Sequence, residues 1–467
     1  MGRMTPDPQY DLIVLGGGSA GETAASRVAL AGRRVALVES RLVGGECPYW
    51  GCIPSKALLI AASRRRQAGS AHTLGAVDVP LEMGDSAAAW QQALRMRDER
   101  AHHLDDTETA QGLAGEGVEI VRGEGRITAP GRVKVGEREL SYENLLISVG
   151  ADAVLPPIPG LSDARAWTSD DALTSHELPQ SLLILGGGAI GVELAQVFST
   201  FGTVVTVVEA MDRLLPGEEP EVSALVRDVL AKTGVIVSLG VGVERVSTSG
   251  GGTVLHLADG TQFMADRLLV ATGRRPRTKG YGLEVLGIDT SGGGVTSGRD
   301  GRVPGHRNVY AAGDVTGKHP FTHTANYAGR VVATNVLGGD ATMHLDAVPR
   351  GVFIDPPVAG VGVSAEQARK DGRTVVRATM DIGGTARGWL ESEEGVVVLN
   401  ADAERGILIG ASAVGPRADE WIAQVTLAVR AEVPIATLVD TIQPFPAVSE
   451  ALFPAYERLL EQLRDVG

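Results

Sequence analysis

The sequence predicts an α/β fold made of two strand–helix–strand units of the same design, followed by a C-terminal α+β region. Each unit begins with a short apolar run that leads directly into a glycine-rich turn. In both units an acid follows the first glycine of the turn by 23 positions, at Glu39 after Gly16 and at Glu209 after Gly186. After about residue 345 the pattern changes to apolar runs typical of antiparallel strands, so a separate region is expected there.

The first unit predicts a dinucleotide-binding site. Its expected elements are a strand at Asp11–Leu15, a helix at Ala24–Ala31 and a strand at Arg34–Glu39. Glycines in the turn permit close approach of the backbone to a pyrophosphate, and the helix N-terminus favours the phosphate charge. Glu39 stands where an acid accepts a hydrogen bond from a ribose hydroxyl. The glycines with this role are Gly16, Gly18 and Gly21.

The second unit repeats these features and predicts a second Rossmann-type site. Its glycines are Gly186, Gly188 and Gly191, after the apolar run Ser181–Leu185. Glu209 closes the strand Val204–Glu209, and a carboxylate there accepts from a free ribose 2′-hydroxyl but repels a 2′-phosphate. Arg213 lies four residues further on, which leaves NADPH possible. The acid therefore favours NADH at this site.

The only two cysteines, Cys47 and Cys52, lie in the segment Gly44–Lys56 with four residues between them. Pro54 suits the first turn of a helix, and the helix N-terminus favours a reactive thiolate over a thiol. A structural zinc site would need about four ligands, and the nearest histidine is His72. A structural disulfide would close only a small loop, with a small entropic effect. We therefore favour a redox-active cysteine pair.

Composition limits the function classes. The chain has 467 residues, of which 43% are hydrophobic, and a net charge of −14, which argues against nucleic acid or an anionic membrane as a partner. The first ten residues contain no signal-peptide region and no apolar run is long enough to cross a bilayer, so a cytoplasmic protein is expected. Arg64–Arg66 is interpreted as a solvated helix face. His102–His103 is interpreted as exposed, and no metal site is predicted.

The cysteine segment resembles the active-site segment of the class I pyridine nucleotide-disulfide oxidoreductases, the family of glutathione reductase, dihydrolipoamide dehydrogenase and mercuric reductase. The later segment Asn308–Asp314 resembles the family's second flavin motif. The resemblance implies that Cys47 exchanges with substrate and that Cys52 lies on the flavin side. It also implies that the first unit binds FAD, that the second binds NADH or NADPH, and that the C-terminal region forms a homodimer.

The implied FAD-binding domain is split by an inserted NAD(P)-binding domain. The expected ranges are 8–155 and 275–342 for the FAD-binding domain, 156–274 for the NAD(P)-binding domain and 345–467 for the α+β interface domain. The helix expected at Ala87–Arg100 is predicted to pack on the FAD-binding domain. In the interface domain we expect antiparallel strands at Val396–Leu399 and Gly406–Gly410 and helices at Trp421–Arg430 and Ser449–Leu463.

The resemblance also implies roles for individual residues. Lys56 would pair with Glu193 beside the flavin, where a charged lysine stabilises the anionic character of reduced flavin. Thr322 would begin a helix directed at the flavin, next to His323. The predicted catalytic residues are Cys47, Cys52, Lys56, Glu193 and Glu450. The predicted cofactor-binding residues are Gly16, Gly18, Gly21, Glu39, Gly45, Lys56, Gly125, Gly150, Asp314, Thr322, Gly186, Gly188, Gly191, Glu209 and Gly273.

One position departs from the family. Phe445, two residues after Gln443, occupies the place of the histidine that acts with a glutamate on the partner's cysteines, whereas Glu450 remains. Disulfide cleavage requires protonation of a leaving thiolate, and a positioned acid or base typically contributes about 10² to 10⁴-fold. We therefore predict a quinone-like or other small non-disulfide acceptor. Tyr49 and Trp50 are interpreted first as packing residues, and the sharper hypothesis is an aromatic mouth that they form with Phe445. The alternatives are a low-molecular-weight disulfide, a metal ion, or a redox-sensing flavoprotein that rarely turns over.

Overall fold

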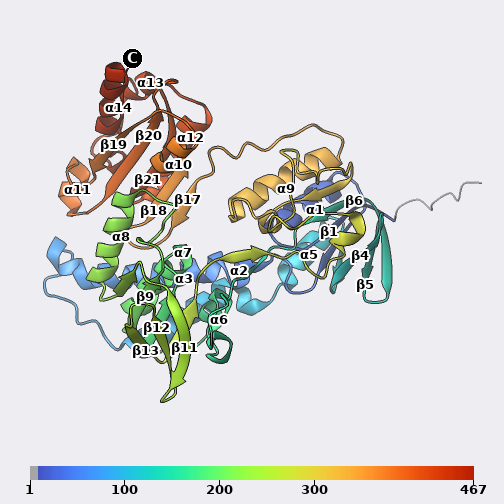
Figure 1. The fold of residues 1–467 in the computed structure, drawn as a ribbon, viewed down its shortest axis with the longest axis horizontal. Coiled ribbons are helices and arrows are strands. Elements are labelled where there is room, and N and C mark those ends of the chain that lie inside the picture. The colour runs from blue at the N-terminus through green and yellow to red at the C-terminus, as the bar shows by residue number, and fades with distance from the viewer. Residues whose placement is uncertain (1–8, 467) are drawn as a thin grey trace, which may run out of the picture. The chain divides into compact units, whose positions relative to one another are not determined.

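The computed structural model describes residues 9–466. Within this range the chain forms two compact units. The first unit comprises 9–54, Arg95–Val154 and Gly273–His344, and the second comprises Ser55–Leu94, Leu155–Thr272 and 345–466. Figure 1 labels the helices and strands. This division into two units does not test the predicted limits of the three domains.

The first unit is built on a parallel sheet with an antiparallel extension. Its strands are β1 (Tyr10–Leu15), β2 (Val35–Glu39), β3 (Val118–Arg122), β4 (Gly125–Ala129), β5 (Arg132–Val135), β6 (Arg138–Ile147) and β16 (Val309–Ala311). They run in the order β3-β2-β1-β6-β5-β4, and β16 pairs with β6. Leu12, Ile13 and Val14 of β1 are fully buried, as expected for a strand of a parallel sheet that is covered on both faces.

Two helices lie side by side in the first unit, α1 (Ser19–Leu30) and α9 (Thr322–Val336) (Figure 1). Their close approach depends on Gly329, because a Cβ atom there would lie 2.5 Å from the carbonyl oxygen of Ala20. Glycine at such a contact lets two backbones meet without a side chain between them. The C-terminal part of the split unit therefore packs directly on its first helix.

The second unit contains a parallel sheet of the same design. Its strands are β8 (Ser181–Leu185), β9 (Val204–Glu209), β10 (Ile236–Leu239) and β14 (Arg267–Val270), in the order β10-β9-β8-β14. The helices α6 (Ser169–Thr174), α7 (Ala189–Thr200) and α8 (Pro220–Lys232) accompany it. An antiparallel sheet is formed by β11 (Val243–Ser249), β12 (Gly252–Leu257) and β13 (Gln262–Ala265). The repeat predicted from the two glycine turns is thus a repeat of structure.

The helices that follow the cysteine segment are α3 (Cys52–Ser70) and α4 (Ser86–Arg100). Trp90 of α4 is almost fully buried, with its ring 5.5 Å from that of Phe198 and 5.2 Å from that of Phe201. Because these aromatic residues lie in and just after α7, the N-terminal part of α4 packs on the second unit. The expected packing of this part on the FAD-binding domain is therefore wrong.

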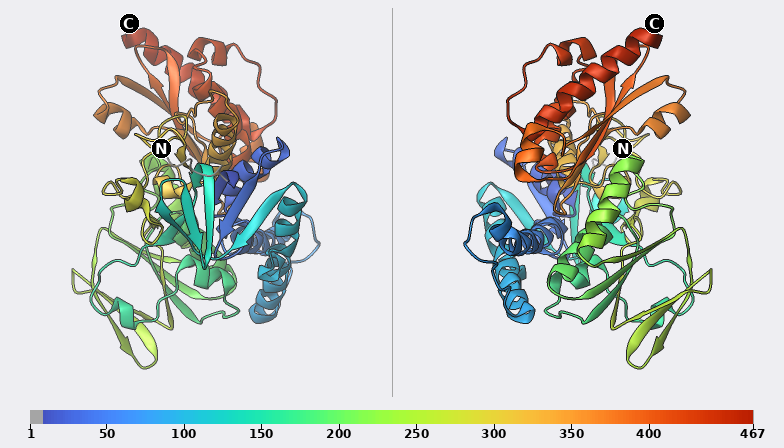
Figure 2. Two further views of the ribbon diagram at one scale, coloured as in Figure 1. Left: turned by 90° about the vertical axis from the view of Figure 1, so that its right-hand side faces the viewer. Right: turned by 90° about the vertical axis from the view of Figure 1, so that its left-hand side faces the viewer.

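The C-terminal region is an antiparallel sheet in the order β17-β18-β21-β20-β19. The strands are β17 (Arg350–Val352), β18 (Val358–Gly362), β19 (Val375–Asp381), β20 (Val396–Asp402) and β21 (Ile407–Val414). The long helix α14 (Leu452–Val466) crosses the sheet, as Figure 2 shows, and α12 (Ala418–Arg430) packs on it as well. Buried Val425, Leu452 and Leu459 belong to the shared core. The predicted α+β character of this region is confirmed.

The remaining elements are short connections. They include α2 (Glu46–Tyr49), α5 (Thr107–Gly115), α10 (Ala365–Lys370), α11 (Ala386–Glu391) and α13 (Ile435–Val439), and the strands β7 (Ala151–Ala153) and β15 (Arg274–Pro276). The 3₁₀ segments are η1 (Ala71–Leu74), η2 (His102–Leu104), η3 (Leu161–Asp163), η4 (Leu283–Leu286), η5 (Asp314–Thr316) and η6 (Val448–Ala451). Between residues 9 and 466, no helix combines the length and apolarity needed to span a membrane.

Candidate active site

The first glycine turn has the shape of a phosphate cradle. Gly16 has a φ of +97°, and a Cβ atom there would lie 2.5 Å from the carbonyl oxygen of Ser148. A Cβ atom at Gly21 would lie 2.1 Å from the carbonyl oxygen of Gly16. Gly18 is the N-cap of α1, and Gly45 approaches it so closely that a Cβ atom would lie 2.7 Å from the Gly18 Cα atom. The backbone N–H groups at this helix start are therefore not covered by side chains of the turn.

Glu39 ties this turn to the end of β2. One carboxylate oxygen accepts from the Gly17 N–H at 2.7 Å, and the other accepts from the Arg41 N–H at 2.6 Å. A carboxylate has about four acceptor positions, so lone pairs remain for a ribose hydroxyl. The residues present thus fit the adenosine and pyrophosphate part of a dinucleotide.

The second glycine turn repeats this geometry. Gly186 has a φ of +114°, and a Cβ atom at Gly191 would lie 2.0 Å from the carbonyl oxygen of Gly186. Gly188 is the N-cap of α7. Glu209 accepts from the Gly187 N–H at 2.6 Å and from the Met211 N–H at 2.7 Å.

Arg213, the residue that left NADPH possible, is engaged by acids. Its guanidinium forms ion pairs with Asp212 at 3.5 Å and with Glu366 at 3.6 Å, and it donates to the carbonyl oxygen of Pro216 at 3.3 Å. These contacts hold the positive charge of Arg213 in place and partly neutralise it.

The other predicted cofactor residues fall into different environments. Gly150 and Gly273 have positive φ angles of +78° and +137°, which only glycine adopts without strain. Gly125 is set by packing instead, because a Cβ atom there would lie 2.7 Å from the Leu15 side chain. Burial raises the pKa of Asp314, although the positive charges of Arg274 and Arg277 oppose the shift. A half-buried acid at that position suits donors such as ribityl hydroxyls.

The two cysteines lie on consecutive helices. Cys47 belongs to α2 and Cys52 is the first residue of α3, as the position of Pro54 in the first turn predicts. Both side chains are half-buried. The Cys52 sulfur lies 3.3 Å from the hydroxyl of Thr322, the first residue of α9. Helix start and hydroxyl together stabilise negative charge on this sulfur.

Glu46 connects α2 to the strand β15 and to the residue that follows it, Arg277. Its carboxylate forms an ion pair with Arg274 and lies 3.4 Å from the guanidinium of Arg277. Arg277 also pairs with Asp152 at 2.6 Å. The short helix that carries Cys47 is thereby held by charged contacts within the first unit.

The aromatic residues of the cysteine segment are core residues. Tyr49 and Trp50 have exposed fractions of 1% and 7%, and the Tyr49 hydroxyl donates to the carbonyl oxygen of Val43 at 2.9 Å. Arg41 lies over the Trp50 ring, 3.9 Å from its centroid. The preferred interpretation of Tyr49 and Trp50 as packing residues is therefore confirmed, and the alternative of an aromatic mouth is wrong for these two residues.

A cavity of about 490 Å³ opens at Cys47. It is lined by the exposed side of α1, by the end of α5 and by the cysteine segment. Two acids, Glu22 and Glu116, face it, together with Arg27. Burial raises the pKa of Glu22, and the negative charge of Glu116 adds to the shift. Neither acid was singled out from the sequence, because neither belongs to a motif with a recognisable spacing.

The predicted pair of Lys56 and Glu193 is present in the second unit. The Lys56 ammonium lies 3.1 and 3.2 Å from the two carboxylate oxygens, and the exposed fractions of the side chains are 31% and 8%. One Glu193 oxygen also accepts from the Phe353 N–H at 2.9 Å, while the lysine charge lies 4.6 Å from the centre of the Phe353 ring. The buried carboxylate is therefore paired and hydrogen-bonded.

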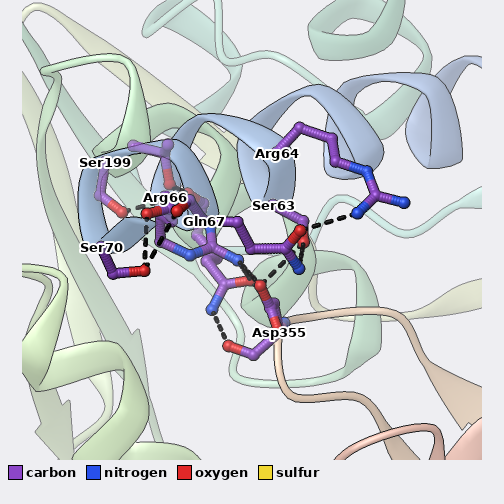
Figure 3. Close-up of polar contacts among 9 residues, drawn as sticks. Ser63, Arg64, Arg66, Gln67, Ser70, Ser199 and Asp355 are labelled. Carbon is purple, nitrogen blue, oxygen red and sulfur yellow. Dashed lines mark hydrogen bonds and ion pairs between the residues drawn. The ribbon is translucent and has the colours of Figure 1, made fainter. Parts of the chain in front are cut away.

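A polar network follows on the same helices (Figure 3). Arg66 pairs with Asp355 at 3.0 Å and donates to Gln196 and Thr200 at 3.2 and 2.9 Å. Ser63 donates to the same Asp355 oxygen at 2.8 Å. The interpretation of Arg64–Arg66 as a solvated face is thus wrong for Arg66, whose side chain is only 23% exposed. The network joins α3 and α7 to the segment that contacts Glu193.

The candidate residues of the C-terminal region make few polar contacts. Phe445 is 75% exposed, and Gln443 accepts from the Gln424 amide at 3.3 Å. One carboxylate oxygen of Glu450 is buried and has no hydrogen-bond partner among the described residues. His102 and His103 are exposed as predicted, and no cluster of potential metal ligands occurs among residues 9–466.

Comparison with known proteins identifies the family. Residues 10–329 match the model of the pyridine nucleotide-disulphide oxidoreductases, and residues 348–456 match the dimerisation domain of the same proteins. The chain therefore belongs to the pyridine nucleotide-disulphide oxidoreductase family and is an oxidoreductase of the flavoprotein disulfide reductase type. FAD and NAD(P)H are typical of this family, and the dimerisation domain implies a homodimer.

Relatives are similar over nearly their whole length. A dihydrolipoyl dehydrogenase of Thermus scotoductus is 36% identical over 465 residues, covering 97% of this chain and 98% of the relative. A mercuric reductase of Staphylococcus aureus is 32% identical, covering 96% and 82%. Among solved structures, the Cu(II) complex of the HOCl-induced flavoprotein disulfide reductase RclA from Escherichia coli superposes with a TM-score of 0.82 at 30% identity, covering 96% of this chain and 99% of that chain.

Proposed function

We propose that this protein is an NADH-dependent flavoprotein reductase that uses Cys47 and Cys52 to reduce a low-molecular-weight disulfide. The observation that carries the proposal is the position of Cys47 at a cavity of about 490 Å³, a volume suited to a small molecule rather than a protein domain. The relatives named as dihydrolipoyl dehydrogenases support a disulfide acceptor more than the quinone-like acceptor expected from Phe445.

The chemistry consumes one NADH and one proton for each disulfide and yields NAD⁺ and two thiols. The Cys47 thiolate attacks one sulfur of the acceptor, and the first thiolate leaves and takes up a proton. Cys52 then attacks the mixed disulfide at Cys47, which releases the second thiol and leaves a Cys47–Cys52 disulfide. FAD, when bound, supplies two electrons from NADH to reopen that disulfide.

The surrounding residues support these roles. Thr322 and the start of α3 stabilise a Cys52 thiolate. Glu193 holds the Lys56 ammonium in α3, one helical turn after Cys52. The two glycine turns would hold FAD and NADH, with Glu39 and Glu209 on the riboses, and Gly45, Gly150, Asp314 and Gly273 would complete the cofactor sites.

NADH is favoured over NADPH by charge. A 2′-phosphate would approach Glu209, and the nearby Arg213 is already paired with Asp212 and Glu366. We also retain Glu450 as a catalytic candidate, because its buried carboxylate oxygen lacks a partner among the described residues. The proposed domain ranges are 8–155 with 275–342, 156–274 and 345–467.

The test is steady-state oxidation of NADH and of NADPH by the purified holoenzyme with a panel of acceptors. We expect turnover with small disulfides, a lower KM for NADH than for NADPH, and loss of turnover in Cys47→Ser. Turnover with quinones that survives Cys47→Ser and exceeds the disulfide rate would overturn the proposal.

A second candidate acceptor is a quinone-like molecule. Phe445 favours it, because a large apolar side chain that is 75% exposed provides a surface for a flat, uncharged ring and no proton for a leaving thiolate. Thiophilic metal ions form a further arm of the panel, since relatives include a mercuric reductase and a Cu(II) complex of RclA.

A further inference from the structure

We propose that the cavity beside Cys47 is an electrostatic filter that admits small disulfides bearing ammonium groups and disfavours anionic ones. The inference deepens the proposed function and rests on it for the identity of the acceptor. It does not rest on it for the charge of the cavity, which can be measured on the thiol itself.

The charge of the cavity comes from two helices. Glu22 lies in the first turn of α1, whereas Glu116 is the C-cap of α5. Both face the same cavity as Cys47. They are near enough for the charge of Glu116 to act on the ionisation of Glu22, and one oxygen of Glu116 is buried without a hydrogen-bond partner among the described residues. Two neighbouring carboxylates that line one cavity attract a cationic ammonium group and repel an anion.

One cation opposes them. Arg27, in the last turn of α1, also faces the cavity but is itself exposed to solvent. With both acids ionised, these three side chains carry a net charge of −1. Solvent screens the exposed guanidinium more than the half-buried carboxylates, so these side chains make the electrostatic potential at Cys47 negative.

The rest of the lining is uncharged. It includes polar residues, among them Ser19, Ser26 and Thr109, and the apolar Leu113 and Ile53. Such a lining contacts the carbon chain and neutral groups of a small molecule, and leaves the choice between charged acceptors to the acids. Cystamine, with an ammonium group on each side of its disulfide, represents the expected class.

The first experiment reads the potential at Cys47 without turnover. Cys52→Ser leaves Cys47 as the single thiol of the chain. Its rates with the cationic trimethylammonium-ethyl and the anionic sulfonatoethyl methanethiosulfonates are measured by the mass increase, as the thiolate displaces methanesulfinate. The ratio of the two rates is divided by the same ratio for 2-mercaptoethanol, which removes the intrinsic difference between the reagents.

We expect the normalised ratio to be about 10, the effect of one unit charge at roughly 10 Å with partial screening. Glu22→Gln with Glu116→Gln lowers it severalfold, and Arg27→Gln raises it. Glu284→Gln, a highly exposed acid of the same unit paired with Arg126, leaves it unchanged. A normalised ratio near 1, or a ratio that the double variant does not change, overturns the inference.

The second experiment uses the holoenzyme with its two cysteines. The values of kcat/KM are compared for cystamine, bis(2-hydroxyethyl) disulfide and 3,3′-dithiodipropionate, which differ mainly in charge. We expect kcat/KM to be highest for the cationic disulfide and lowest for the anionic one. The differences in kcat/KM should become smaller in Glu22→Gln with Glu116→Gln. Equal values for all three disulfides support the proposed function and overturn the filter. Lack of turnover with every disulfide defeats the proposed function, while the thiol-reactivity ratio still decides the charge of the cavity.

Discussion

At the scale of single residues, the pair of Lys56 and Glu193 sets a half-exposed cation against an almost fully buried carboxylate. Glu193 keeps one backbone partner, the Phe353 N–H, but a lone N–H does not neutralise a buried charge. Removing one partner of such a pair is more costly than the pair itself is favourable, because the other charge stays buried.

Lys56→Ala should therefore lower the free energy of unfolding by about 2 kcal/mol, less than the full cost of a buried unpaired charge because Lys56 is partly exposed. Urea denaturation followed by tryptophan fluorescence measures this change. The matched control is Lys232→Ala, which breaks an exposed ion pair with Glu394 and should cost less than about 1 kcal/mol. Equal effects of the two substitutions would contradict the argument.

The acid at the cavity makes a pH prediction. Burial raises the pKa of Glu22, so its ionised form is less favourable in the folded state than in the unfolded state. Such a carboxyl contributes stability that is fully present below its unfolded pKa, roughly 4, and is lost as the pH rises through the raised folded value. Glu22→Gln should thus have a higher Tm than the parent at neutral pH, and the difference should vanish at about pH 4. A thermal scan over pH, with Glu284→Gln as the exposed control, measures it.

The residues that sequence reasoning missed share one cause. Arg66 finds Asp355, 289 positions later, and Glu22 meets Glu116 only after α1 and α5 have folded into the same unit. A local pattern contains no information on such partners. In contrast, Cys47 and Cys52 stand in one short segment whose residue types indicate redox chemistry, and the pair of Lys56 and Glu193, 137 positions apart, was expected only from the resemblance to the family.

At the scale of elements, both glycine turns are tied to the strand that follows their helix. Glu39 and Glu209 each accept from a backbone N–H of their own turn, which holds the loop open before a nucleotide arrives. An added side chain would also clash in the same way in both turns. Cβ atoms at Gly21 and Gly191 would lie 2.1 and 2.0 Å from the carbonyl oxygen of the first glycine of their own turn.

The two turns should therefore fail separately. Gly21→Ala should yield protein with little bound flavin, whereas Gly191→Ala should retain flavin and lose NADH affinity by at least about tenfold, because each Cβ forces its own turn open. Flavin content from the absorption spectrum and NADH titration by fluorescence quenching measure the two losses.

Gly112→Ala is the matched control for the turn variants. Gly112 lies inside α5, and an added Cβ there would meet no neighbouring element within 4 Å. The variant should therefore bind flavin and NADH like the parent, and its helix should be slightly more stable. Loss of both ligands in either turn variant would show that the turns do not act independently.

The strands next to the glycine turns, β1, β2, β8 and β9, were predicted within one residue, because buried parallel strands form continuous apolar runs. The helix predicted at Ala24–Ala31 begins five residues earlier, at Ser19, because the glycine turn leads directly into it. The C-terminal helix begins at Leu452 rather than Ser449, since η6 occupies Val448–Ala451. The packing of Trp90 on Phe198 was not predictable, because helix pattern shows which face is apolar and not which partner covers it.

At the scale of the whole molecule, the dimerisation domain carries large apolar side chains in solvent. Ile442 is 96% exposed and Phe445 is 75% exposed, three positions apart in one loop. Single exposed apolar residues are common on monomers. Two of them close together in a dimerisation domain indicate that this loop becomes buried when the dimer forms.

Ile442→Asp should shift the protein from dimer toward monomer, because it would place a charge in an apolar contact. Sedimentation velocity at several concentrations measures the shift, and a change in the dissociation constant of at least about tenfold is expected. The control is Leu30→Asp, an exposed apolar residue at the end of α1. A dimer as stable as the parent would contradict this role of the loop.

The strand pair β7 and β15 has a consequence for how the chain tolerates insertions. Ala153 faces Arg274 across this pair, and the Val154 N–H donates to the Gly273 carbonyl at 2.9 Å, so the points of departure and return are neighbours. The stretch from 155 to 272 is therefore bounded like a cassette. Because its two ends are adjacent, this stretch can change in length or content without altering the order of the strands in the first unit's sheet.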